Sequence, residues 1–190
     1  MYESVLRDPT PERASLLRPR KIPPASLEGK TVALMDIGKM RGDEFIDRLE
    51  ELFAGAGVTT RRYKKPTNTR TAPMSMIQDI AENCDLVVIA LSDCGSCTSC
   101  STHDLNDLDQ RGLPGVSVLT TEFRDAFAKQ CASIGFEGAS LYVPHPMQNR
   151  TTAELHRLAE ASFESIRASL CCPVSASASS PIQSTITVSN

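Results

Sequence analysis

Three cysteines and a histidine recur at intervals of three residues in one short stretch of this chain: Cys94, Cys97, Cys100 and His103. A thiolate is both a nucleophile and a metal ligand, and Cys-x-x-Cys is the spacing of thiol–disulfide couples, in which one thiol attacks and the other resolves. We therefore interpret Cys94 as a nucleophile and Cys97 as its resolving partner. Cys100 is the alternative resolving thiol.

The same four side chains are also candidates for a metal site. Three thiolates and an imidazole form a known zinc set, and the thiol spacing matches part of the bacterial iron–sulfur run. However, structural zinc ligands usually come as two pairs from separated segments, and the iron–sulfur run continues to a fourth Cys and a Pro that are absent here. Thiol chemistry is the first hypothesis, a metal-binding or carrier role stays open, and we assign no metal.

The segments around the thiols predict how they are positioned. An apolar run of strand length, 86–91, stops at Ser92-Asp93. Ser101-x-x-Asp104 is close to a capping box and predicts that a helix starts there, with His103 in its first turn. The thiols would then lie between a strand end and a helix start. Converging N–H groups and the positive end of the helix dipole favour a thiolate at that point.

The rest of the chain alternates predicted strands with amphipathic helices. The predicted strands are 30–36, 58–64, 86–91, 116–120 and 141–143. Helical patterns of 10–20 residues separate or follow them. This alternation predicts an α/β fold with three α/β/α layers and a roughly five-stranded parallel sheet. Right-handed crossovers favour a flavodoxin-like strand order, with the polar segment 58–64 near an edge.

Ligands of such sheets bind outside the carboxyl ends of the strands, so the loops there form one predicted crevice. His103 and His145 are the candidate general acids or bases, and His145 lies between two prolines at the end of the fifth strand. Further polar residues of these loops are candidates for substrate binding: Asp36, Lys65, Asp93, Ser96 and Thr120.

Composition and missing motifs exclude several classes of function. No G-x-G-x-x-G or G-x-x-x-x-G-K-[ST] motif is present, so we expect that the protein binds no nicotinamide, flavin or ATP. We expect its substrate to be a small molecule. The net charge of −3 does not favour nucleic acid or an anionic membrane, and no apolar run approaches a membrane span. The N-terminus lacks a secretory signal, so we expect a cytoplasmic protein. Its seven cysteines then suit catalysis or metal binding better than structural disulfides.

The chain divides into three predicted regions. Residues 1–29 are rich in Pro and form an extended arm, which lies across the domain or across a second copy in a homodimer. Residues 30–172 form a single α/β domain. Residues 173–190 are rich in Ser, Ala and Thr without periodicity, which predicts a disordered tail.

The run from Cys94 to Ser101, CGSCTSCS, resembles the motif for which the UGSC family is named. The resemblance extends over most of residues 8–168. Members carry selenocysteine or cysteine at the first motif position, which implies that Cys94 is a strongly nucleophilic, redox-active residue. Relatives have Asp-Asn-Gly after the first strand where this chain has Asp36-Ile37-Gly38, so one side-chain amide is lost.

These observations together predict a cysteine-dependent enzyme that acts on a small molecule through Cys94. Thiol-redox or C–S bond chemistry is the first hypothesis. Covalent or acid/base catalysis without redox change, as in a lyase, decarboxylase or hydrolase, is an alternative.

Overall fold

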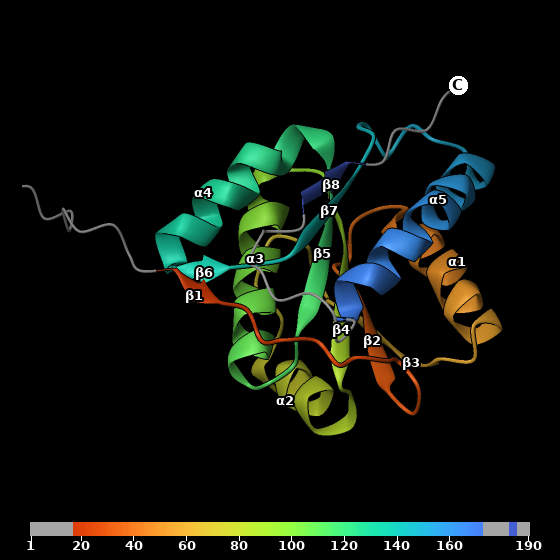
Figure 1. Cartoon of the computed structure of the whole chain (residues 1–190). Coiled ribbons are helices and arrows are strands. Elements are labelled where there is room, and N and C mark those ends of the chain that lie inside the picture. Colours follow the sequence, from red (N-terminus) through yellow and green to blue (C-terminus); the bar gives the residue numbers. More distant parts are fainter. Residues whose placement is uncertain (1–16, 173–182, 186–190) are drawn as a thin grey trace, which may run out of the picture.

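The computed structural model describes residues 17–172 and 183–185, which build a six-stranded parallel sheet between two layers of helices (Figure 1). In spatial order the strands are β3 (Thr59–Lys64), β2 (Thr31–Asp36), β4 (Leu86–Ser92), β5 (Gly115–Thr120), β7 (Ser140–Val143) and β8 (Gln183–Thr185). Without β8, the chain order across the sheet is 2-1-3-4-5. This order is the flavodoxin-like one, so the predicted fold class is confirmed, with the polar strand at an edge.

Helices cover both faces of the sheet (Figure 1). One face carries α1 (Gly42–Gly55) and α5 (Thr152–Leu170), and the other carries α2 (Met74–Asn83), α3 (Gly95–Gln110) and α4 (Arg124–Ile134). Successive side chains of β4 enter the two cores alternately: Val88 packs on the α1/α5 side and Val87 on the side of α2, α3 and α4. Every residue of β4 is buried, as expected for a central parallel strand.

The N-cap of helix α3 lies seven residues earlier than the sequence predicts. Cys94 is its N-cap and Gly95 its first residue, whereas Ser101 and Asp104 lie buried inside the helix. The predicted capping box is therefore wrong, and the thiols lie in the first two turns of a helix instead of in a loop. The Gly-, Ser- and Thr-rich start has low helix propensity. Packing against the sheet overrides that propensity, since Cys97 and the leucines of the helix belong to the core.

The described part of the N-terminal arm packs on its own chain. β1 (Arg18–Pro19) pairs in parallel with β6 (Phe136–Glu137). The buried Asp109 carboxylate accepts hydrogen bonds from the Arg18 guanidinium at 2.5 Å and from the Lys21 backbone N–H at 2.8 Å. Residues 1–16 lie outside the described residues, and contact of the arm with a second copy stays a prediction.

The C-terminal segment contains a strand that its composition does not predict. Gln183–Thr185 form β8, which extends the sheet beside β7. An edge strand pairs through backbone N–H and C=O groups, so a Ser- and Thr-rich sequence does not prevent it. The remainder of the predicted disordered tail, 173–182 and 186–190, lies outside the described residues.

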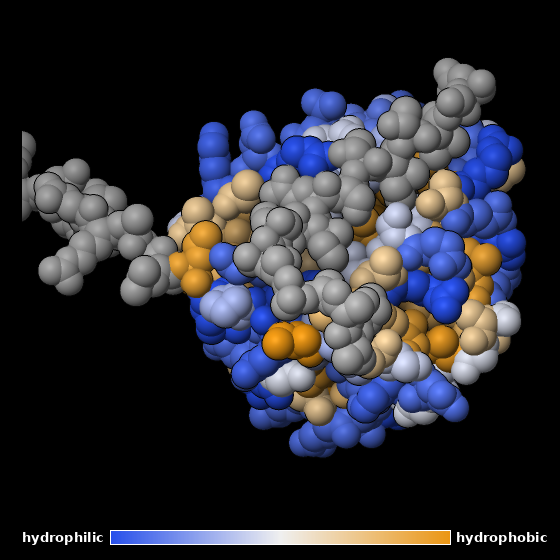
Figure 2. All heavy atoms as spheres, in the orientation of Figure 1, coloured by the Kyte–Doolittle hydropathy of each residue, from blue (hydrophilic) through white to orange (hydrophobic). Residues whose placement is uncertain are grey.

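The coloured part of the face drawn in Figure 2 is mostly polar. Figure 2 shows hydrophobic residues in separate small groups among hydrophilic ones on the face drawn. Large hydrophobic side chains that are exposed include Leu17, Ile22, Met40 and Met74. Within 17–172 and 183–185, no helix is both long and apolar enough to cross a membrane.

Candidate functional site

The order of the strands reverses between β2 and β4, because the chain leaves β2 for the edge strand β3 and returns to β4 on the other side. Ligands of open parallel sheets bind at the carboxyl end of such a switch point. Asp36 ends β2 and is fully buried, and Asp93 directly follows β4. The switch point is therefore lined by two of the predicted carboxylates, and α3 starts beside it.

Cys94 and Cys97 form a disulfide at the N-terminus of α3. The Cys97 backbone N–H donates to Cys94 Sγ at 3.4 Å, so the sulfur occupies the place of an N-cap acceptor. Thr98 donates to the Cys94 carbonyl through its N–H at 3.0 Å and its hydroxyl at 2.8 Å. Cys94 is half-buried and Cys97 is fully buried. Solvent thus reaches the first sulfur, while the second faces the core.

Asp93 lies beside the dithiol. One of its carboxylate oxygens and the sulfurs of Cys94 and Cys97 all lie within 4.8 Å of one another. Asp93 Oδ1 is 2.9 Å from Lys39 Nζ, and the carboxylate is only 4 % exposed. Lys39 comes from the loop after β2, so this ion pair joins the loops that follow β2 and β4.

The loop after β2 depends on Gly38. Its φ is +78°, and a Cβ built there would lie 2.7 Å from the Lys65 carbonyl oxygen. Only glycine fits this close backbone approach. The Gly38 N–H donates to Asp36 Oδ1 at 2.8 Å, and Lys64 Nζ lies 3.2 Å from Asp36 Oδ2. Asp36 therefore organises this loop and the one after β3.

The loop after β3 is fastened to α3 by a buried ion pair. Lys65 Nζ lies 2.6 Å from Asp104 Oδ2, and the Ala72 N–H donates to Asp104 Oδ1 at 2.8 Å. Burial raises the pKa of the Asp104 carboxyl, and Lys65 opposes that rise. The Lys65 side chain is fully buried, so its charge is neutralised inside the protein and is not offered to a substrate as predicted.

This fastened loop carries a residue that sequence reasoning missed. Asn68 Nδ2 donates to Cys97 Sγ at 3.1 Å. An N–H donor at a thiolate stabilises its negative charge. No pattern in the sequence links Asn68 to Cys97, because the contact spans 29 residues and two loops. The lone signal is its place in a loop at the carboxyl edge of the sheet.

Two further predicted residues lie at the same edge. Ser96 is exposed, and its Oγ is 3.5 Å from Cys94 Sγ. Thr120 ends β5 and is buried, with its Oγ1 3.0 Å from His145 Nδ1. His145 is exposed and lies edge-on to the Phe123 ring. The structure thus joins His145 to the end of β5, the neighbour of β4.

His103 and Cys100 lie on α3 at a distance from the Cys94–Cys97 couple. At about 1.5 Å of rise per helical residue, Cys100 lies about 9 Å and His103 about 13 Å along the axis from Cys94. His103 is exposed, and its Nε2 lies 3.2 Å from Gln130 Nε2 on α4. His103 therefore lies too far along α3 to exchange a proton directly with Cys94. The predicted four-residue metal set does not converge on one point, because the helix separates residues that the loop would have brought together.

The described cysteines outside the disulfide are free, and several are ill suited to nucleophilic chemistry. Burial raises the pKa of the thiols of Cys84, Cys131 and Cys171. A higher pKa lowers the thiolate fraction at neutral pH. Cys84, Cys131 and Cys171 are therefore weaker candidates for a nucleophile than the two cysteines of the motif.

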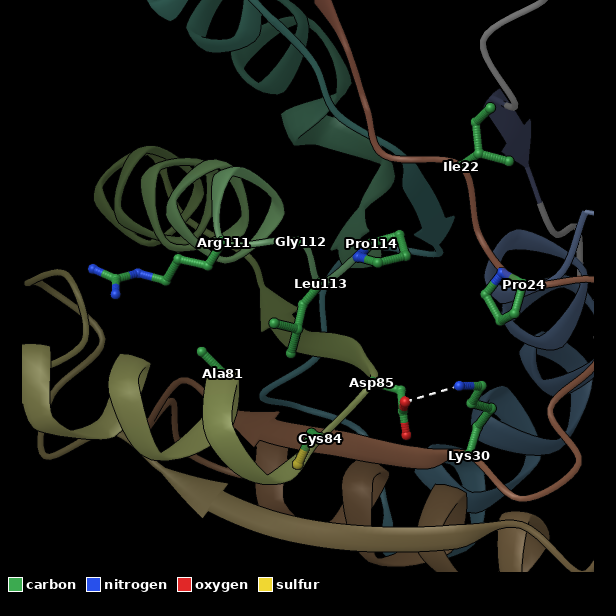
Figure 3. Close-up of a pocket in the computed structure, with 10 residues that line it drawn as sticks. All are labelled: Ile22, Pro24, Lys30, Ala81, Cys84, Asp85, Arg111, Gly112, Leu113 and Pro114. Carbon is green, nitrogen blue, oxygen red and sulfur yellow. Dashed lines mark hydrogen bonds and ion pairs between the residues drawn. The ribbon is translucent and has the colours of Figure 1, made fainter.

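A hollow of about 410 Å³ lies at the opposite edge of the sheet (Figure 3). Lys30, Asp85 and Pro114 line it, and each directly precedes a strand. Lys30 Nζ and Asp85 Oδ1 form an ion pair across it at 3.0 Å. The hollow is therefore separated from the dithiol by the length of the strands and is not part of this site.

The fold and this site define a flavodoxin-like α/β protein with a Cys-x-x-Cys couple at the carboxyl edge of its sheet. Residues 5–172 match the model of the UGSC family. The chain belongs to the UGSC family, which confirms the resemblance of its motif.

Solved structures with a similar course of the chain share little sequence. A diflavin flavoprotein from Nostoc sp. has a TM-score of 0.47 at 11% identity, covering 74% of this chain and 93% of that one. A flavodoxin variant from Pseudomonas aeruginosa has a TM-score of 0.45 at 16% identity, covering 74% and 98%. A flavodoxin-like domain from Synechococcus sp. has a TM-score of 0.39 at 9% identity, covering 70% and 96%. A search of curated proteins found no significant match.

Proposed function

We propose that the protein is a thiol–disulfide oxidoreductase for a small molecule, with Cys94 as the attacking thiol and Cys97 as the resolving thiol. The observation that carries this proposal is the Cys94–Cys97 disulfide at the N-terminus of α3. Thiols at helix N-termini and in Cys-x-x-Cys motifs favour the thiolate, because backbone N–H groups and the helix dipole stabilise the negative charge.

The unequal exposure of the two sulfurs supports these separate roles. Cys94 is half-buried, so a small substrate can reach it, and the exposed Gly95 and Ser96 leave its outer side open. Cys97 is fully buried and takes an N–H donor from Asn68 at 3.1 Å. A thiol in this position reacts with an adduct on its neighbour far more readily than with a molecule in solution.

The proposed reaction consumes a small disulfide. The Cys94 thiolate attacks one sulfur of the substrate, forms a mixed disulfide and expels the other half as a thiolate. The Cys97 thiolate then attacks Cys94 Sγ and expels the second half. The substrate gains two electrons and, after protonation, becomes two thiols, while the protein dithiol is oxidised to the Cys94–Cys97 disulfide.

His145 is the proposed proton donor to the departing thiolates. It belongs to the carboxyl edge that also carries Cys94, and Thr120 Oγ1 holds its Nδ1 at 3.0 Å. An exposed imidazole can take a proton from solvent and pass it on. His103 takes no part in this scheme, since it lies about 13 Å farther along α3.

The experiment traps the mixed disulfide. Protein reduced with a phosphine and freed of it by gel filtration is mixed with an aromatic disulfide that releases a coloured thiolate. Beyond the thiolate released by the five free cysteines outside the couple, wild type should release two thiolates as the Cys94–Cys97 disulfide returns. Cys97→Ser should release one and keep the adduct on Cys94, as read by peptide mass spectrometry. Cys94→Ser should leave Cys97 unmodified, because that sulfur is buried.

Cys100→Ser is the matched control, since it removes a nearby thiol that lies outside the couple, and it should behave like wild type at the Cys94–Cys97 pair. Release of two thiolates at this pair by Cys97→Ser, with no adduct left on Cys94, would refute the disulfide mechanism. Equal reaction of Cys94→Ser and wild type at this pair would refute Cys94 as the nucleophile.

A further inference from the structure

We infer that the reduced site is also a binding site for a thiophilic divalent cation of the zinc class, with Asp93, Cys94 and Cys97 as its ligands. Their ligand atoms lie within 4.8 Å of one another in the disulfide form. Ligands of a tetrahedral zinc ion lie about 2.0–2.3 Å from the metal, and hence about 3.4–3.8 Å from each other. The two sulfurs are bonded to each other in this form, so reduction must let them move apart to about 3.8 Å, with the Asp93 oxygen about 3.5 Å from each.

The state of Asp93 points to a cation. Its carboxylate is 4 % exposed, and within the described residues its buried Oδ1 accepts no well-aligned hydrogen bond. This oxygen lies 2.9 Å from the Lys39 ammonium. A buried carboxylate oxygen with one ion-pair contact and no aligned donor retains the capacity to bind a metal.

The balance of charge explains why the metal belongs to the reduced form. In the disulfide form the Asp93 carboxylate and the Lys39 ammonium cancel. Reduction and ionisation of Cys94 and Cys97 add two negative charges beside this pair. A divalent cation restores neutrality, and its binding releases the two thiol protons. The disulfide supplies no thiolate, so oxidation removes the site.

The surroundings of the three ligands also suit a metal. The Asn68 amide donates to Cys97 Sγ at 3.1 Å, which is an outer-sphere contact of the kind that orients metal ligands. Three protein ligands leave a fourth position, and the half-exposed Cys94 lies on the side open to solvent. Cys100 and His103 lie too far along α3 to complete the set. The donor set therefore differs from the cysteine–histidine run that the sequence predicts.

This inference shares the dithiol with the proposed function but makes a separate claim, and metal binding would hold the couple in an inactive state.

Reduced protein is titrated with Zn²⁺ against a coloured chelator, and with Cd²⁺ while the sulfur-to-cadmium absorption is recorded. Reduced wild type should bind one ion per chain through Asp93, Cys94 and Cys97, and the oxidised protein should bind none there. Cys97→Ser should abolish binding, and Asp93→Asn should weaken it at least about tenfold.

Lys39→Met is a sharper variant, because it removes the cation that competes for Asp93 and should tighten binding. Cys100→Ser and His103→Ala are the matched controls and should bind like wild type, with circular dichroism to verify folding. Failure of reduced wild type to bind would refute the metal site. This donor set would also be refuted if both controls lost binding while Asp93→Asn bound the metal as tightly as wild type. Disulfide exchange measured without metal tests the proposed function independently.

Discussion

Replacement of Lys65 by Met should destabilise the protein strongly, because it leaves the Asp104 carboxylate buried without its cation. Lys65 is fully buried and lies 2.6 Å from Asp104 Oδ2. Removal of one partner of a buried ion pair typically costs about 3–5 kcal/mol. For a chain of this size, about 1 kcal/mol lowers the melting temperature by about 2–4 °C, so the expected loss is about 6–20 °C.

The pH dependence of this loss identifies its cause. Burial already raises the pKa of Asp104 above its unfolded value, and Lys65 opposes that rise. Between the unfolded and the folded pKa of Asp104, the folded chain keeps a proton that the unfolded chain has released. The contribution of Asp104 to stability therefore falls as pH rises through this range. Without Lys65 the folded pKa rises further, so Lys65→Met should lose stability toward neutral pH more steeply than wild type.

Thermal unfolding followed by circular dichroism between acidic and neutral pH tests this prediction. The double variant Lys65→Met/Asp104→Asn is the control, because the amide oxygen still accepts the Ala72 N–H without a buried charge. It should recover much of the lost stability and remove the added slope with pH. A single variant as stable as wild type at neutral pH, or a double variant no better than the single, would refute the reasoning.

Two further variants test the loops around the dithiol. Asn68→Ala removes the donor to Cys97 Sγ and should slow release of the mixed disulfide by about 2- to 10-fold, since one hydrogen bond contributes about 0.5–1.5 kcal/mol. An unchanged rate of release in stopped-flow assays would contradict this prediction. Gly38→Ala should cost at least about 1 kcal/mol more in urea unfolding than Gly29→Ala. Both glycines have positive φ, but an added Cβ meets the Lys65 carbonyl at 2.7 Å only at Gly38, and equal losses would disprove the steric account.

The sheet could be predicted because its signals are local. The run 86–91 is buried on both faces, and its length and its polar end fix where the strand stops. The order of the strands followed from handedness rules that hold for parallel sheets in general. The candidate nucleophile Cys94 could be found for the same reason, since the spacing of the motif and the strand before it are both local.

The start of α3 and the partners of the site could not be predicted in this way. Ser101 and Asp104 have the types and spacing of a capping box, but Ser101 bonds to Ser92 at 3.1 Å and Asp104 pairs with Lys65 inside the protein. Both contacts depend on tertiary packing. Asn68 is missed for the same reason, because its partner Cys97 lies on another element. Local sequence cannot distinguish a buried lysine from an exposed one when its counterion is 39 residues away.

The contacts of Asp109 have a practical consequence for fragments of this protein. A fragment that starts at Lys30 would begin neatly at the first long strand, yet it would lack Arg18 and Lys21, which both bind the buried Asp109. It would also uncover Phe136, over which the Arg18 guanidinium lies at 4.8 Å. A fragment should therefore keep Arg18 and Lys21, and an affinity tag or protease site is best placed upstream of Arg18.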